Sequence, residues 1–229
     1  MDPVITRLDL ARTPLRAVNA ALHAPGGSGD FVVENPAGAH NLAVGLACSL
    51  NVTINGHVGY YAAGMNQRAA VIIEGNAGTG VAENMMSGTV TVRGNASQSA
   101  GATAHGGLLV IEGNAAARCG ISMKGVDIVV GGNVGHGSAF MAQAGRLVVR
   151  GDAGDGLGDS IYEARLYVRG RVASLGADCV AKEMRPEHRE ELAALLKAAG
   201  YEGDDPAAYT RYGSARTLYH FHAANSARY

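Results

Sequence analysis

Apolar residues recur with a fixed period of 19 residues along most of this chain. Each period holds a short run of β-branched residues or leucine, and a glycine follows the run. Residues four and two positions before the glycine are apolar, and in a strand these two positions face the same side. The two rows are Val52, Val71, Val90, Leu109, Ile128, Leu147 and Leu166, and Ile54, Ile73, Val92, Ile111, Val130, Val149 and Val168. Seven repeats without an insertion predict a solenoid of stacked coils.

The glycines that mark the period are expected to be structural. Small residues follow two and three positions later, and three Gly-x-Gly pairs are typical of tight corners that need positive φ or close backbone approach. The side chains of Asn76, Asn95, Asn114 and Asn133 each follow such a glycine, so stacking predicts an asparagine ladder. The phased glycines are Gly56, Gly75, Gly94, Gly113, Gly132, Gly151 and Gly170.

A second apolar row lies ten residues after each glycine. It contains Met85, Ala104, Met123, Ala142, Ile161 and Val180, and Asn66 interrupts it. Two apolar faces and one glycine corner in each 19 residues predict a parallel β-helix of about seven coils. Leucine-rich repeats, hexapeptide helices and calcium-binding nonapeptide repeats fit less well, because the leucine, the six-residue period and the aspartates that they require are missing. On the outer side, Glu74, Arg93 and Glu112 are predicted to pair from coil to coil.

The flanking segments have a different pattern. Thr13-Pro14 indicates a helix over residues 14–23, with Thr13 as its N-cap, and residues 31–33 indicate a strand before an irregular first coil. Pro186 to Gly200 is predicted to be an amphipathic helix, with acidic residues early and Lys197 late. We therefore divide the chain into an N-terminal helical cap (1–30), the β-helix (31–182), and a C-terminal helix with an extended tail (183–229).

The tail is rich in aromatic and basic residues. Either it folds back over the last coil or it docks on another protein, and enrichment in aromatic residues and arginine favours an interface. The residues predicted to form this partner interface are Tyr209, Arg211, Tyr212, Arg216, Tyr219 and Phe221.

Composition limits the class of protein. The chain has 229 residues, 47% of them hydrophobic, and a net charge of −1, so no global charge favours nucleic acid or an anionic membrane. Three cysteines without a C-x-x-C pair argue against a disulfide framework and against a cysteine-only metal site. The first residues lack the features of a signal peptide and no run is long enough for a membrane span, so we expect a cytoplasmic protein.

Several residues could carry chemistry, and each has a plainer interpretation. The glycine runs 75–80 and 151–156 are similar to phosphate-binding loops, but each leads into another coil instead of opening a helix. Histidines are candidate metal ligands, although their phases in the repeat differ, and surface histidines are the alternative. Acidic residues near the last coils could form a catalytic carboxylate pair, as in pectin-cleaving β-helices. These histidines are His57, His105, His136, His220 and His222, and the acids are Asp155, Asp159, Glu163 and Asp178.

The repeat resembles a known family. Three segments have the spacing G-x-x-G-x-G, at 75–80, 132–137 and 151–156, and the match covers roughly residues 31–179. This pattern is similar to the GXGXG β-helix at the C-terminus of the glutamate synthase large subunit, and more weakly to a subunit of formylmethanofuran dehydrogenase. Residues 13–16 and 212–219 look like the stand-alone form of the domain, as in N-methylglutamate synthase.

The resemblance implies a right-handed β-helix without catalytic residues of its own. It would act as a scaffold subunit of N-methylglutamate synthase, which converts methylamine and glutamate to N-methylglutamate and ammonia. The implied partners are a class II glutaminase-like subunit and a glutamate-synthase-like subunit that carries FMN and an iron-sulfur cluster. No cofactor is expected in this chain. The alternatives are a subunit of glutamate synthase proper, a scaffold like that of formylmethanofuran dehydrogenase, and a stand-alone carbohydrate-active β-helix.

Overall fold

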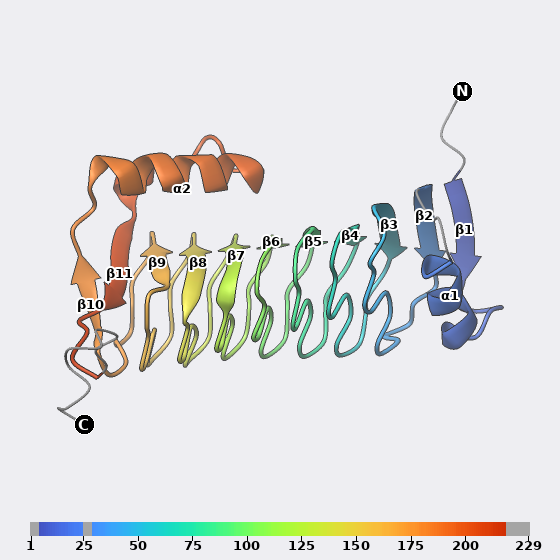
Figure 1. Ribbon diagram of the computed structural model, residues 1–229, viewed down its shortest axis with the longest axis horizontal. Helices are drawn as coiled ribbons and strands as arrows, with labels where there is room; N and C mark the ends of the chain where they lie inside the picture. Colours follow the sequence, from blue (N-terminus) through green and yellow to red (C-terminus); the bar gives the residue numbers. More distant parts are fainter. Residues whose placement is uncertain (1–4, 25–28, 219–229) are drawn as a thin grey trace.

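The computed structural model describes residues 5–24 and 29–218. In this part of the chain, one sheet of 11 strands runs along a solenoid of about seven turns (Figure 1). The strands of the column are β2 (Gly29–Glu34), β3 (Leu50–Asn55), β4 (Ala70–Ile73), β5 (Thr89–Val92), β6 (Leu108–Ile111), β7 (Lys124–Val130), β8 (Ala144–Val149) and β9 (Arg165–Val168). The predicted β-helix is confirmed.

The strands pair in parallel, in the register that the repeat predicts. Val52 lies opposite Val71, and each later member of the two apolar rows lies opposite the next, as far as Val149 and Val168. Both rows are buried along the whole column. The first coil has a different spacing. Val33 pairs with Ile54, which lies 21 residues later instead of 19, and this confirms the predicted out-of-phase start.

A second line of pairing runs along another side of the column. One parallel bridge joins each coil to the next through the small residues two positions after the phased glycine, from Val58 and Ala77 to Ala153 and Val172. Further backbone hydrogen bonds join successive coils at the turns, such as Met65 N–H to the Glu83 carbonyl at 2.8 Å. Neighbouring coils are therefore tied together on several sides, which stiffens the column.

The glycine pattern has two separate physical causes. In the Gly-x-Gly pairs the first glycine gives space, since a Cβ at Gly78 would lie 2.5 Å from the Gly59 carbonyl carbon. The second supplies the left-handed conformation, since Gly80 has φ +73°. The phased glycines from Gly75 onward likewise serve close approach: a Cβ at Gly75 would lie 2.7 Å from the backbone of Gly56.

The asparagine ladder is present, but it is built from side chains and backbone. The Oδ1 atom of Asn76 accepts the backbone N–H of Asn95 at 2.8 Å, and this contact repeats up the column. Asp152 continues the series by accepting the N–H of Arg171 at 2.7 Å. The predicted stacking of amides occurs once, between Asn95 and Asn76 at 3.4 Å. Each side chain thus satisfies a corner N–H of the next coil.

The row ten residues after the glycine is buried as predicted, with one exception. Met85, Met123 and Ile161 are fully buried, and Asn66 is also buried, where its Nδ2 donates to the carbonyls of Ala69 and Ser87. Val180 was predicted to be inside and is 37% exposed. The reason is that its strand, β10 (Cys179–Lys182), pairs with β11 (Thr210–Ser214) instead of continuing the coil.

The N-terminal end carries a strand that the sequence pattern did not reveal. β1 (Ile5–Asp9) extends the sheet by pairing in parallel with β2. Helix α1 (Leu15–Leu22) follows and buries Val18 and Leu22 against the first coil. The helix predicted over residues 14–23 is confirmed, but Thr13 is not its N-cap; Pro14 occupies that position, and no side chain caps the helix.

The segment after residue 185 folds back to cover the C-terminal end of the column. Helix α2 (Pro186–Ala198) confirms the predicted amphipathic helix, and Gly200 beyond it has φ +83°. A short 3-10 helix, η1 (Pro206–Ala208), leads into β11. β11 lies antiparallel between β9 and β10, so part of the tail folds back over the last coil.

Candidate functional site

Helix α2 lies on the outer face of the sheet, across the last strands of the column (Figure 1). Residues three positions before each phased glycine point outward, and the last three of them are Val129, Val148 and Tyr167. These residues are fully buried because the leucines of α2 and Tyr209 pack on them. Each such apolar side chain contributes about 1.5–3 kcal/mol when buried. The members from α2 are Leu192, Leu195 and Leu196.

The same outward row continues over the earlier strands without a helix above it. Thr53, Ile72 and Thr91, on β3, β4 and β5, are partly buried, and we call them the open sheet face. Beside this surface, Arg93 pairs with Glu74 at 3.8 Å and with Glu112, which confirms the predicted coil-to-coil pairs. The open sheet face is therefore weakly apolar and has charged residues beside it, as protein interfaces often do.

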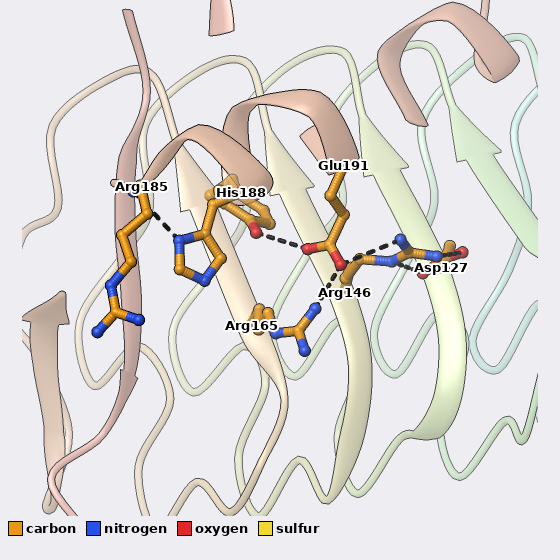
Figure 2. Close-up of polar contacts among 7 residues, drawn as sticks. Asp127, Arg146, Arg165, Arg185, His188 and Glu191 are labelled. Carbon is orange, nitrogen blue, oxygen red and sulfur yellow. Dashed lines mark hydrogen bonds and ion pairs between the residues drawn. The ribbon is translucent and has the colours of Figure 1, made fainter. Parts of the chain in front are cut away.

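A partly buried acid, Glu191, anchors α2 to the sheet. Glu191 accepts a hydrogen bond from the Tyr167 hydroxyl at 2.6 Å and pairs with Arg165 and with Arg146, at 3.5 Å from the latter (Figure 2). Arg146 also pairs with Asp127 on the neighbouring strand. Burial, and then the Glu191 carboxylate, raises the pKa of Tyr167 above its ordinary value. This network fixes the position of α2 along the column.

A second acid fixes the segment after α2. Asp204 accepts two hydrogen bonds from Arg150, at 2.6 and 2.8 Å, and one from the Tyr209 hydroxyl at 2.7 Å. Arg169 lies 3.3 Å from the same carboxylate, and the Arg150 guanidinium lies 3.9 Å from the centre of the Tyr201 ring. Hydrogen bonds from Arg150 are the main reason that the pKa of Asp204 falls to about 2. We call these residues the Asp204 clamp.

The structure places four of the six predicted interface residues within the chain's own packing. Tyr209 is buried in the cluster under α2, and Arg211 Nε donates to the Glu183 carbonyl at 2.9 Å. Tyr212 lies in β11 and packs against the main core, while Arg216 pairs with Glu163 at 2.7 Å. Tyr219 and Phe221 lie outside the described residues. Residues 210–214 of the tail thus fold back onto the column. Docking of its last residues on a partner stays a prediction.

The candidate histidines are not brought together. His57 starts the asparagine ladder, because its Nδ1 accepts the Asn76 N–H at 2.9 Å. His105 and His136 are exposed on different coils, and His220 and His222 lie outside the described residues. Within residues 5–24 and 29–218, no three histidine, cysteine, aspartate or glutamate side chains are close enough to hold a metal ion.

Two of the four candidate carboxylates share a groove. Asp155 and Asp159 line a groove of about 310 Å³ together with Arg118, His136 and Phe140. Asp155 accepts a hydrogen bond from Ser174 at 3.0 Å, and Asp159 accepts one from Ser160 at 2.7 Å. Glu163 and Asp178 line other parts of the surface, where each has partners of its own.

Two of the three cysteines are buried, and the glycine runs lie at turns of the coils. Cys119 and Cys179 are buried, and burial raises the pKa of their thiols to about 12 and about 11. Both therefore stay protonated at neutral pH. The glycine runs 75–80 and 151–156 lead into turns of their own coils, and no helix begins at either run. No helix of the described residues is long and apolar enough to span a membrane.

Comparison with curated proteins finds one close relative at nearly full length. Protein GlxC of Rhizobium meliloti (strain 1021) is 60% identical over 225 residues, which cover 97% of this chain and 99% of the relative. No family model matches the chain, and no solved structure matches it.

Proposed function

Because this chain belongs to the family of protein GlxC, we propose that it is a structural subunit of a glutamate-synthase-related enzyme complex. Two observations support the proposal. The 19-residue glycine repeat resembles the β-helix of the glutamate synthase large subunit, and the repeat forms a rigid column with inter-coil hydrogen bonds on several sides. A column of this kind can hold other subunits at fixed positions along its length.

The open sheet face is the observation that carries the scaffold role. It continues the outward row that α2 covers at the other end of the column, where apolar residues of the same row are buried. The chain thus already uses this sheet face to bind a helix. A partner subunit that presents an apolar helix or loop would bind the uncovered part in the same way.

More specifically, we propose that the complex is N-methylglutamate synthase. The partners would be a class II glutaminase-like subunit and a glutamate-synthase-like subunit with FMN and an iron-sulfur cluster, in a cytoplasmic assembly. The column would frame the path of ammonia or methylamine between them and would leave the chemistry to the partners. A complex that makes glutamate is the alternative with the same scaffold role.

Charged substitutions on the open sheet face are expected to release the partners. We suggest co-expressing the tagged chain with the proposed glutaminase-like and flavin subunits and measuring their recovery by affinity purification. The double variant Ile72→Glu/Thr91→Lys keeps the net charge, and both side chains point away from the core, so the variant should fold. The amount of partner recovered with it should be about tenfold lower. The matched control is Thr79→Glu/Gln98→Lys, which changes exposed residues of the same two coils on another side.

Equal recovery with both double variants would contradict docking on the open sheet face. If the native chain purified without partners and cleaved a polysaccharide, the scaffold proposal would fail altogether. In that case the groove that Asp155 and Asp159 line would be the place to look for the active site.

The end of the tail can be tested separately from the fold. Deleting residues 219–229 leaves β11 and its bonds in place, so the circular dichroism spectrum and melting temperature should stay unchanged while partner recovery falls. Deleting residues 209–229 also removes Tyr209 and β11, and we expect it to lower the melting temperature, because β9 loses its neighbour. Full partner recovery after the shorter deletion would remove Tyr219 and Phe221 from the interface.

A further inference from the structure

A strongly basic cleft lies at the C-terminal end of the column. It has a volume of about 390 Å³ and lies among residues 162–165, β10, β11 and the residue before α2. Five of its lining side chains are cationic and one, Glu163, is acidic. The volume falls in the range of small-molecule sites, which is about 300–1,000 Å³. The cationic residues are Arg165, Lys182, Arg185, Arg211 and Arg216.

Three of these cations form ion pairs with carboxylates. Arg165 pairs with Glu191, Arg185 lies 3.0 Å from Glu183, and Arg216 lies 2.7 Å from Glu163. The Arg165 pair is shared, because Glu191 also lies 3.5 Å from Arg146. The carboxylates therefore offset only part of the positive charge that converges here.

The other two cations have no ion pair in the described chain. Arg211 uses Nε for the Glu183 carbonyl, a neutral acceptor at 2.9 Å, and Lys182 appears in no ion pair among residues 5–24 and 29–218. Both extend from paired strands, since Lys182 lies opposite Arg211 in the β10–β11 register. Within the described residues, the cleft thus holds two neighbouring positive charges that form no ion pair with a carboxylate.

The electrostatics of the cleft favour an anion. Burial lowers the pKa of Arg211 below its ordinary value, and the positive charges of Arg165 and Arg185 act in the same direction, against the opposing influence of Tyr167 and Glu191. His188, which lies between Arg185 and Arg165 in Figure 2, also has a lowered pKa, first from burial and then from Arg211. Like charges held close together are unfavourable, and a bound anion would relieve this repulsion.

We propose that this cleft binds the phosphate group of a small molecule. Arginine guanidinium groups recognise phosphate through parallel N–H bonds, and lysine adds a point charge. Several converging cations suit a dianion better than a single carboxylate, which one arginine can satisfy. The absence of a side chain at Gly213, on the cleft wall, leaves room beside Lys182.

The test uses the full chain and inorganic phosphate as the probe. Isothermal titration should show saturable binding, and each of Arg211→Gln and Lys182→Gln should weaken it about tenfold, because each removes one charge-assisted contact. Two variants are needed because Arg211 also contacts the Glu183 backbone. Arg189→Gln is the control, since Arg189 is exposed on α2 and does not line the cleft. Acetate at the same ionic strength should compete weakly.

Three results would overturn the assignment. The first is a lack of saturable binding in the millimolar range, and the second is unchanged affinity in both charge-removing variants when circular dichroism shows that they are folded. The third is competition by acetate as strong as that by phosphate, which would make the cleft a general anion or carboxylate site.

Discussion

Replacing Gly113 by alanine is expected to lower the free energy of unfolding by about 2–4 kcal/mol. A Cβ at this position would lie 2.6 Å from Asn95 Oδ1 and 2.7 Å from the Gly94 carbonyl oxygen. Neither atom can retreat easily, because Asn95 Oδ1 accepts the Asn114 N–H and the Gly94 carbonyl accepts the Gly113 N–H. The stack must open locally at this coil. Chemical denaturation followed by circular dichroism would measure the loss.

Gly203→Ala is the matched control for this experiment. No atom lies within 4 Å of the Cβ that this substitution would add, so it should change the stability by less than about 0.5 kcal/mol. If Gly113→Ala were as stable as Gly203→Ala, close coil-to-coil approach would not be the reason for the phased glycines.

Replacing Asp204 by alanine should have the second large effect. The substitution removes the paired bonds to Arg150 and the acceptor of the Tyr209 hydroxyl, and it leaves a half-buried guanidinium without its carboxylate. Hydrogen bonds to charged groups contribute about 1.5–3 kcal/mol each, and solvent screening reduces this, so we expect a total loss of about 3 kcal/mol. Thermal unfolding would show it, and Glu202→Ala, an exposed neighbour, should leave the melting temperature unchanged.

The Asp204 clamp also predicts a pH dependence. The pKa of Asp204 is about 2 in the folded protein, below its ordinary value of 3.8. A lowered carboxyl pKa contributes stability that is complete above the unfolded value and is lost as the pH falls through the folded one. Native protein should therefore lose stability more steeply between pH 4 and pH 2 than Asp204→Asn does. Parallel acid-denaturation curves for the two proteins would contradict the assigned role.

The repeat predicts the column well because its period and its packing have the same cause. Each apolar residue lies beside the equivalent residue of the next coil, as Val71 lies beside Val90. Burial therefore follows directly from the 19-residue spacing. The ends do not repeat, and there the prediction weakens. β1 has no periodic partner in the sequence, and Val180 is exposed because β11 displaces its strand from the coil.

The candidate sites were harder to predict because they depend on contacts between distant segments. Composition correctly marks the tail as unusual, but it does not distinguish docking on a partner from docking on the chain itself. Tyr209 is buried in one cluster with Val148 and Tyr167. These three residues are far apart in the sequence, so no local pattern predicts that they are in contact. The basic cleft likewise combines Arg165, Lys182 and Arg211, which belong to three different strands. A signal was present in the outward row, where valines and then Tyr167 follow the threonines of earlier coils.

The position of β11 has a consequence for how the chain is made. Val168 on β9 pairs with Thr210, a residue that leaves the ribosome much later than β9 itself. Until then the newest coil exposes unpaired backbone groups, the feature at which strands of other chains can add. Any product that stops short of β11 would leave the edge of β9 unpaired, so premature termination should yield aggregating fragments. In the completed chain, β11 pairs with β9 and covers this edge.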